Sequence, residues 1–338
     1  MEHDEFEPRD ELSTELERGW ESVAEGNLLD AAQAAEAALE LEPQSPEAFN
    51  LLGFVQAAQG ELDLALSSYA HAVTLDPGFF EAMLNAAELL LHPLGRLEAA
   101  HEMVDLALEQ AESPEERADA LLIRIEAFLL GGDRGAAAAA ASQLPEGPLE
   151  PPHLEFAVAR ALFDVGDLDA ARPRVLAAAQ PGTKNPDAFY YLGLLLEADD
   201  DRAGSTVAFL ESLGLDARLG PPLALRHERF ERLVQGALRR LPRRLQDALE
   251  GALVVVTELP GAEVVAEGID PRIPVLLDEV EPSEPPRARR LFVYQRNIDR
   301  VAGPADVEDI LLDVLREELL HVFPTLGSPS HPPPGLDD

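Results

Sequence analysis

The sequence predicts a mainly α protein in which a long α-solenoid of helical hairpins precedes a small α+β domain. Three observations predict this fold class: an internal repeat of helical hairpins, a change of charge near residue 220, and two β-rich segments that follow that change. The predicted organisation is an acidic tail at residues 1–11, the solenoid at 12–220, the α+β domain at 221–326 and a Pro-rich tail at 327–338.

The composition limits the classes of protein to which the chain can belong. Its 338 residues include 64 acidic and 26 basic side chains, for a net charge of -38, and 46% are hydrophobic. This is too apolar for a disordered acidic chain and long enough for two domains with cores. The absence of cysteine excludes disulfides, thiolate metal sites and cysteine nucleophiles. The charge also argues against nucleic acid or an anionic membrane as partner, because both would be repelled.

No segment has the features of a membrane or secretion signal. A spanning helix needs about 20 consecutive apolar residues, and no run in the sequence approaches that length. The first ten residues are acidic, whereas a secretory signal begins with a basic stretch and continues with an apolar one. The expected location is therefore the cytoplasm.

The negative charge is concentrated before residue 220. Residues 1–220 contain 43 acidic and 12 basic side chains, whereas residues 221–300 contain 13 of each. Gly220 and the two prolines after it mark this change and disfavour a continuous helix, so we place a domain border there. Four arginines follow in the next segment: Arg239, Arg240, Arg243 and Arg244. They form either a solvated helix face or a docking surface for the acidic half.

The N-terminal part of the sequence repeats itself at one constant offset. Most matching residues are small or turn-forming, and the last two pairs stand at the end of the unit: Gly19 with Gly53, Gly26 with Gly60, Ala31 with Ala65, Ala38 with Ala72, Leu41 with Leu75, and Pro43 with Pro77. One unit reads as a helix over 46–59, a turn at Gly60 and a helix over 62–76. The small residues are expected where the two antiparallel helices come closest together.

This pattern resembles the tetratricopeptide repeat, a helix-turn-helix unit of the same period, about 34 residues. The resemblance is nearly complete over residues 12–78 and looser in the later copies, which gives about six units. In the sixth unit the segment DAFYYLG at 187–193 is similar to EAFNLLG at 47–53. A short second helix is expected to end at Leu213. The resemblance implies that the units stack into a right-handed superhelix with a concave binding surface.

The same resemblance implies which side chains line the concave surface: Trp20, Asn50, Phe54, Leu84, Glu88 and Tyr190. Family members that bind acidic peptide tails carry Lys, Arg and Asn at these positions, and here only Asn50 agrees. The expected partner is therefore a protein or peptide segment that is hydrophobic or basic. The alternative for Trp20 and Phe54 is that they only pack between neighbouring repeats.

The C-terminal part predicts the order helix, strand, loop, strand, helix. A helix beginning at His227 is interrupted near Pro242, and residues 252–257 and 291–295 read as strands. The Pro- and Glu-rich segment 270–286 is expected to be mostly irregular, with at most a short regular piece at 275–277. A strongly amphipathic helix over 306–322 closes the domain.

This order, with the segments FERLVQGALRRLP, VVVTELP, RLFVYQRNID and LREELLHVF, resembles the minimal zincin-like metallopeptidase family over residues 225–326. Members of that family carry HExxHHFG on the last helix. The resemblance places Glu317 at the first metal-ligand position, Glu318 at the general-base position and His321 at the second-ligand position. In the family motif, two histidines one turn apart hold Zn²⁺ while the glutamate activates the metal-bound water.

Departures from the motif argue against a working zinc site. The first histidine is replaced by Glu317, Pro324 occupies the glycine position after the motif, and Gly327 occupies the position of the third ligand. His331 or Asp337 would have to supply a third donor from the tail. We therefore expect no cofactor, with Glu318 a vestigial base, and weak zinc binding at Glu317 and His321 stays open. The ordinary alternative is that all three are common helix residues.

Two functions from different classes remain. The first is a non-enzymatic adaptor that binds protein through its repeats and carries a catalytically degenerate metallopeptidase-like domain. The second is a zinc-dependent peptidase with an altered metal site that recruits substrate through the repeats. A third possibility is that the C-terminal domain covers the open end of the solenoid.

Overall fold

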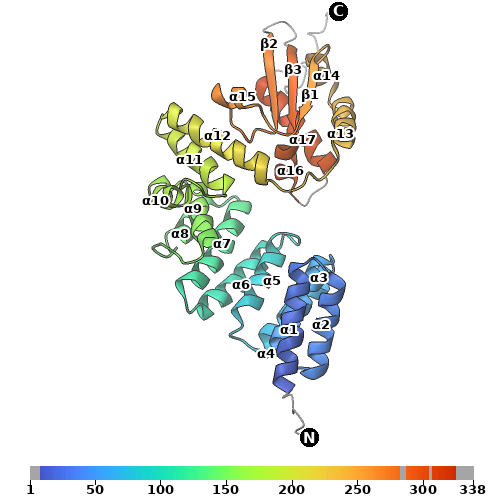
Figure 1. Ribbon diagram of the computed structural model, residues 1–338, viewed down its shortest axis with the longest axis vertical. Coiled ribbons are helices and arrows are strands. Elements are labelled where there is room, and N and C mark those ends of the chain that lie inside the picture. Colours follow the sequence, from blue (N-terminus) through green and yellow to red (C-terminus); the bar gives the residue numbers. More distant parts are fainter. Residues whose placement is uncertain (1–7, 282–286, 304–306, 325–338) are drawn as a thin grey trace, which may run out of the picture. The chain divides into compact units, whose positions relative to one another are not determined.

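The computed structural model describes residues 8–281, 287–303 and 307–324 and divides into two compact units (Figure 1). Unit 1 is Met1–Ala178 and unit 2 is Ala179–Asp338. This division falls one hairpin before the change of composition at residue 220. The first helix begins at Pro8, inside the segment predicted as a tail, and residues 327–338 lie outside the described residues.

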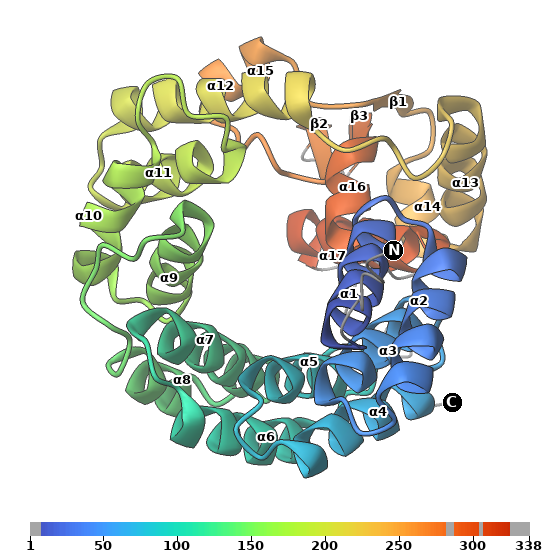
Figure 2. The ribbon, with the colours of Figure 1, turned by 60° about the horizontal axis from the view of Figure 1, so that its bottom comes forward.

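Unit 1 consists of five successive helical hairpins. Their helices are α1 (Pro8–Ala24), α2 (Leu28–Leu41), α3 (Pro46–Ala58), α4 (Leu62–Leu75), α5 (Phe80–Leu91), α6 (Leu97–Gln110), α7 (Pro114–Leu130), α8 (Arg134–Ala141), α9 (Pro152–Asp164) and α10 (Leu168–Ala178). Within this unit the odd-numbered helices lie on the inner side of a curved row and the even-numbered helices on the outer side (Figure 2). The inner helices are therefore those that can line a groove.

Helix α3 shows how the sequence sets the limits of a hairpin. Its N-cap is Ser45, whose side chain accepts a hydrogen bond from the backbone N–H of Ala48 at 3.1 Å, and Pro46 occupies the first turn. After α3 the chain turns at Gly60, where φ is +80°, a conformation that glycine adopts without strain. Helices α3 and α4 match the predicted spans 46–59 and 62–76 within one residue at each end.

Small residues lie where the helices of a hairpin approach closely, as predicted. A Cβ atom at Gly53 would come within 2.7 Å of the ring of Tyr69 and 3.2 Å of the backbone oxygen of Ala65. Tyr69 is only 2% exposed, and Ala65 and Ala72 are fully buried. A larger side chain at position 53 would therefore push α3 and α4 apart.

We expect Gly53→Ala to lower the free energy of unfolding by about 1 to 3 kcal/mol, because the new methyl group overlaps the buried Tyr69 ring. The matched control is Gly135→Ala in the first turn of α8, where an added Cβ meets nothing nearer than 3.5 Å. That control should be neutral or stabilising by about 0.5 kcal/mol, because alanine favours helix. Urea unfolding of both variants measures the difference, and equal effects at the two glycines would contradict the close approach.

Unit 2 begins with a sixth hairpin and continues into a domain that contains a sheet. Its elements are α11 (Pro186–Ala198), α12 (Arg202–Leu219), α13 (His227–Arg240), α14 (Arg243–Ala248), β1 (Leu253–Thr257), α15 (Ala262–Ala266), β2 (Val275–Glu281), β3 (Arg287–Tyr294), α16 (Gln295–Ala302) and α17 (Val307–Val322). The strand order is β1-β3-β2, with β1 parallel and β2 antiparallel to β3. No helix in the described ranges is long and apolar enough to cross a lipid bilayer.

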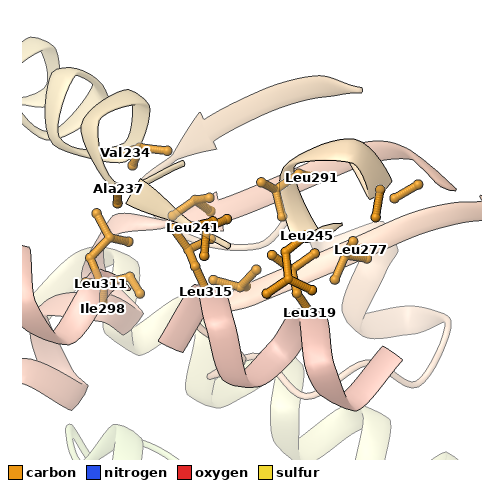
Figure 3. Close-up of a cluster of buried hydrophobic side chains, with 14 of the residues drawn as sticks. Val234, Ala237, Leu241, Leu245, Leu277, Leu291, Ile298, Leu311, Leu315 and Leu319 are labelled. Carbon is orange, nitrogen blue, oxygen red and sulfur yellow. The ribbon is translucent and has the colours of Figure 1, made fainter. Parts of the chain in front are cut away.

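The sheet carries its core on one face. Leu277 of β2 and Leu291 of β3 pack there against α13, α14 and α17, which contribute among others Val234, Leu245 and Leu315 (Figure 3). The alternate residues of the three strands point to the opposite face, where Val255, Leu276 and Phe292 are only partly buried. The alternation of the strand sequences thus fixes which face receives the helices.

The structure corrects three expectations for this unit. Residues 275–281 form the full strand β2, whereas only a short piece was predicted, because backbone pairing with β3 continues past the apolar residues 275–277 into the acidic part of the segment. Strand β3 starts four residues before the predicted Leu291, and Gln295, predicted as its last residue, opens α16. Helices α15 and α16 were not predicted.

Helix α12 does not end at Leu213 as expected but continues to Leu219. Its last two turns are held by a polar residue, Asp216, which is 3% exposed. The two oxygens of its carboxylate lie 2.9 Å from Nη2 of Arg300 and 3.5 Å from Nη2 of Arg272. Buried charges must be paired to be tolerated, so these two guanidinium groups let an acidic residue stand near the end of a packed helix.

Helix α16 connects three segments of unit 2 through buried polar side chains. Gln295 donates to the backbone oxygen of Leu225 at 2.6 Å, and Arg296 donates to that of Pro221 at 2.6 Å. Asn297 is fully buried and donates to two carbonyl oxygens of the loop before β2, those of Pro271 and Ile273, both at 2.9 Å. The sequence QRNID thus joins the linker after α12 to the sheet domain.

Candidate peptide-binding groove

The inner face of unit 1 carries an aromatic pair at equivalent positions of two repeats. Trp20 of α1 and Phe54 of α3 are one repeat apart, and their rings meet edge to face with centroids 5.4 Å apart. Trp20 remains 37% exposed, and Phe54 is half-buried. The pair therefore packs between repeats, as the ordinary interpretation expects, and still presents aromatic surface to solvent.

A pocket of about 320 Å³ lies next to this pair, between α3 and α5. It is lined by Phe54, Ala57, Ala58, Tyr69, Asn85, Glu88, Leu89, His92 and Pro93. The alanines leave room for an incoming side chain, and Tyr69 lies buried behind them. The third equivalent position, Glu88, places a carboxylate beside this apolar space. Such a pocket suits an apolar side chain that is followed or preceded by a cation.

Asn50 and Asn85 form a hydrogen bond across two inner helices. The side-chain N–H of Asn85 donates to the side-chain oxygen of Asn50 at 2.9 Å, and Asn50 is 5% exposed. Asn50, predicted to contact ligand, thus mainly ties α3 to α5. Sequence reasoning missed Asn85, because it stands 35 residues after Asn50, one position away from the repeat offset.

Carboxylates gather next to the pocket on α5 and α7. Burial raises the pKa of Glu88, and the nearby carboxylates of Glu126 and Asp119 raise it further, while His92 acts in the opposite direction. Nε2 of His92 lies 3.4 Å from Oε1 of Glu126. Burial also raises the pKa of Asp119, and His153 opposes this shift. The groove therefore holds negative charge that its own cations compensate only in part.

The raised pKa values fix the sign of the pH dependence. In the folded state Glu88 and Asp119 hold their protons to a higher pH than in the unfolded chain. Folding stability from these groups is therefore present at low pH and falls as the pH rises through their raised pKa values. A ligand cation would favour the ionised carboxylates, so its binding should release protons and strengthen with rising pH in the same range.

Two of the predicted groove residues have other contacts. Leu84 of α5 is partly buried and packs against the apolar core between α5 and its neighbours. Tyr190 belongs to unit 2, where its hydroxyl donates to Oδ2 of Asp270 at 2.9 Å and its ring lies 4.2 Å from the guanidinium carbon of Arg272. At this position α11 thus meets the loop before β2, within unit 2.

The predicted metal-site residues stand on α17. Glu317 and His321 are exposed, and Glu318 is half-buried, with a pKa that burial raises and His321 lowers. Among the described residues, no three His, Asp or Glu side chains are close enough together to hold a metal ion. Gly327, His331 and Asp337 lie outside the described residues. The donors present do not fit the three-ligand zinc site of the family motif, so we derive no metal chemistry from them.

Comparisons with known proteins identify the repeats. The tetratricopeptide repeat family matches residues 16–79. The structure reported as the functional characterization of Pseudomonas aeruginosa pilF is similar at a TM-score of 0.52 and 20% identity, covering 64% of this chain and 95% of that one. The tetratricopeptide repeat protein TTC0263 of Thermus thermophilus gives a TM-score of 0.43 and 24% identity over 55% of this chain and 99% of that one. The comparison with curated proteins gave no match.

The family match and the similarity to the pilF structure show a repeat fold of the tetratricopeptide type. Repeats of this type typically mediate protein–protein interaction. The family match ends at residue 79, and neither it nor these structures supports the metallopeptidase resemblance of residues 225–326.

Proposed function

We propose that this tetratricopeptide repeat protein is an adaptor whose unit 1 binds an extended segment of another protein that carries an apolar side chain next to Arg or Lys. The observation that carries the proposal is the sequence of features along the inner face: the exposed aromatic pair of Trp20 and Phe54, the small apolar pocket, and the carboxylates of Glu88, Asp119 and Glu126. Aromatic anchors supply most of the energy in such interfaces, and charge supplies selectivity and encounter rate.

The charge of unit 1 favours a basic over an acidic partner. Residues 1–178 carry 36 acidic side chains against 9 basic ones, so an acidic segment would meet repulsion at long range and at the groove. The raised pKa of Glu88 adds a local reason, because a guanidinium or ammonium group there would relieve the repulsion among neighbouring carboxylates.

The chain contains its own reporter for the test, since Trp20 is its only tryptophan and lies in the groove. Short synthetic peptides in which leucine and arginine are separated by Gly-Ser spacers should change its fluorescence saturably. The same peptides with glutamate or glutamine in place of arginine should bind much more weakly. Equal binding of the glutamate peptide would refute the proposed selectivity.

We expect Glu88→Gln to change binding and stability in opposite directions. Loss of one carboxylate should lower the affinity for the arginine peptide about fivefold, because a partly exposed ion pair contributes roughly 1 kcal/mol to binding. The same substitution should raise the melting temperature at pH 7, because it removes repulsion from Glu126 and Asp119. Glu109→Gln, at the exposed end of α6, is the matched control and should alter neither quantity. If Glu88→Gln bound the arginine peptide with unchanged affinity, the arginine of the peptide would not lie beside Glu88.

For residues 221–326 we propose a non-catalytic role, with a degenerate metallopeptidase-like site and a covering function next to the sixth hairpin. Glu317 in place of the first histidine, Pro324 in place of glycine and Gly327 at the third-ligand position support this proposal. The alternative function, a zinc-dependent peptidase, requires a bound metal ion. Elemental analysis of protein purified without a His tag tests it: stoichiometric zinc that is lost in Glu317→Ala or His321→Ala would overturn the non-catalytic role.

A further inference from the structure

We propose that strand β1 and helix α13 form a two-fold symmetric surface through which two copies of this chain associate. The first observation is the edge of the sheet. Within the described ranges β1 pairs only with β3, so its other edge is open. Open edges offer unpaired backbone N–H and C=O groups to another strand.

The open edge of β1 lacks the usual protection against pairing. Proteins guard sheet edges with charged residues, prolines, bulges or a covering segment, but β1 reads LVVVT. The opposite edge strand, β2, reads VLLDEVE, with three acidic residues among its seven. The terminal residue Leu253 is 62% exposed. The two edges of one sheet thus differ, and only β1 is suited to accept a strand.

A groove runs beside this edge. Its volume is about 530 Å³, with Val254 and Val256 on one wall and one stripe of α13 on the other: Glu228, Glu231, Arg232, Gln235 and Arg239. All five side chains of this stripe are exposed. A helix of 14 residues spans about 21 Å and a strand of five about 17 Å, so the two walls have similar lengths. A strand added at the β1 edge would therefore lie alongside α13 of its partner.

The charges of α13 favour a second copy of the same chain as the occupant. The groove-lining stripe begins with Glu228 and Glu231 and ends with Arg239. A two-fold axis through Val255 makes the two β1 strands antiparallel, and it also makes the two α13 helices antiparallel. The acidic start of each stripe then faces the basic end of the other. In the described part of the chain neither Glu228 nor Arg239 takes part in an ion pair of its own.

Net charge also points to this region as the contact between copies. The chain carries a charge of -38, so association through most of its surface would be opposed by repulsion. Residues 221–300 are the exception, with 13 acidic and 13 basic side chains. Closed two-fold contacts are the commonest way in which identical chains associate, and this one would cover the β1 edge of both copies and leave only the acidic β2 edges.

The test is sedimentation velocity of the full chain over a range of concentrations. The expected result is a monomer–dimer equilibrium in the micromolar range, as roughly expected for a small interface. Val255→Lys should weaken it at least about thirtyfold, because the axis brings the two ammonium groups together. A chain that stays monomeric at about 100 μM, or a dimer that Val255→Lys leaves unchanged, would overturn the proposal.

Charge reversal with rescue separates this contact from simple misfolding. Glu228→Arg and Arg239→Glu should each weaken the dimer about tenfold, because each creates two like-charge pairs, and the double variant should return to within about threefold of the original. Arg229→Glu, also exposed on α13 but outside the groove, is the control and should change little. Single variants that weaken the dimer without rescue in the double variant would contradict the antiparallel arrangement. Peptide binding at Trp20 is read separately and does not depend on this result.

Discussion

Asp216→Ala is expected to lower the free energy of unfolding of unit 2 by about 3 kcal/mol, more than any surface substitution in the chain. Asp216 is 3% exposed and neutralises two guanidinium groups, those of Arg300 at 2.9 Å and Arg272 at 3.5 Å. Removing the carboxylate takes the buried partner from both cations. Arg272, whose side chain is only 10% exposed, keeps an ion pair with Asp187, a residue whose own side chain is 47% exposed. The cost arises from the lost buried ion pairs and not from the small loss of volume.

Urea unfolding followed by far-UV circular dichroism measures this effect. Two further variants show whether the loss of stability comes from the buried charge. Asp216→Asn keeps the shape but not the charge, and we expect it to lose about 2 kcal/mol. Asp247→Ala removes the partner of Arg243 in an exposed pair, 3.1 Å apart, whose side chains are 84% and 43% exposed. This control should change stability by less than about 0.5 kcal/mol. If Asp216→Ala behaved like Asp247→Ala, the ion pairs would not be what holds the end of α12.

The network around Asp216 also explains why sequence patterns failed there. The second helix of the sixth hairpin was expected to end at Leu213, because the residues that follow break the apolar stripe. In the structure the residues after Leu213 are buried through Leu215, which is 4% exposed, and through the polar Asp216, which is 3% exposed. Periodicity detects apolar faces, so the ion pairs of Asp216 with Arg272 and Arg300, far along the chain, give no such signal.

Helix α16 was missed for the same reason. The buried residues at its start are the polar Gln295, Arg296 and Asn297, and the sequence predicts Gln295 as the last residue of a strand. By contrast, α3 and α4 were predicted within one residue at each end, because their apolar spacing, caps and glycine all agree. Local signals were sufficient for the hairpin of α3 and α4, and they failed for α16 and for the end of α12, where burial is partly polar and depends on distant partners.

The repeat offset predicted some of the residues near the groove and missed others. Trp20, Phe54 and Glu88 follow from the constant repeat offset, and all three belong to the inner helices. Asn85 and Asp119 are one repeat offset apart, but they stand one position after the predicted ligand positions of Asn50 and Leu84, so only the structure relates them to the groove. Tyr190 does stand at such a position, but a loop of the same unit covers it.

Leu315→Ala is expected to lower the free energy of unfolding by about 3 to 4 kcal/mol, because Leu315 is fully buried between α17 and the sheet. Leu311, Leu315 and Leu319 recur every four residues and are all fully buried, so this stripe fixes how α17 rotates on the sheet (Figure 3). The same rotation exposes Glu317 and His321. The matched control is Leu219→Ala at the end of α12, 48% exposed, which should cost less than about 1 kcal/mol.

Comparing how substitutions at Leu315 and at His321 change stability distinguishes a packing role of α17 from a metal-binding role. If α17 is a core helix, His321→Ala should change stability by less than about 0.5 kcal/mol, and added Zn²⁺ should not alter the melting temperature of the unmodified chain or of this variant. A metal site predicts the reverse, since an ion that binds only the folded state raises its stability and its removal lowers it. Thermal unfolding with Zn²⁺ and with a chelator distinguishes the two. Stabilisation by Zn²⁺ that disappears in both Glu317→Ala and His321→Ala would assign the helix to metal binding as well as to packing.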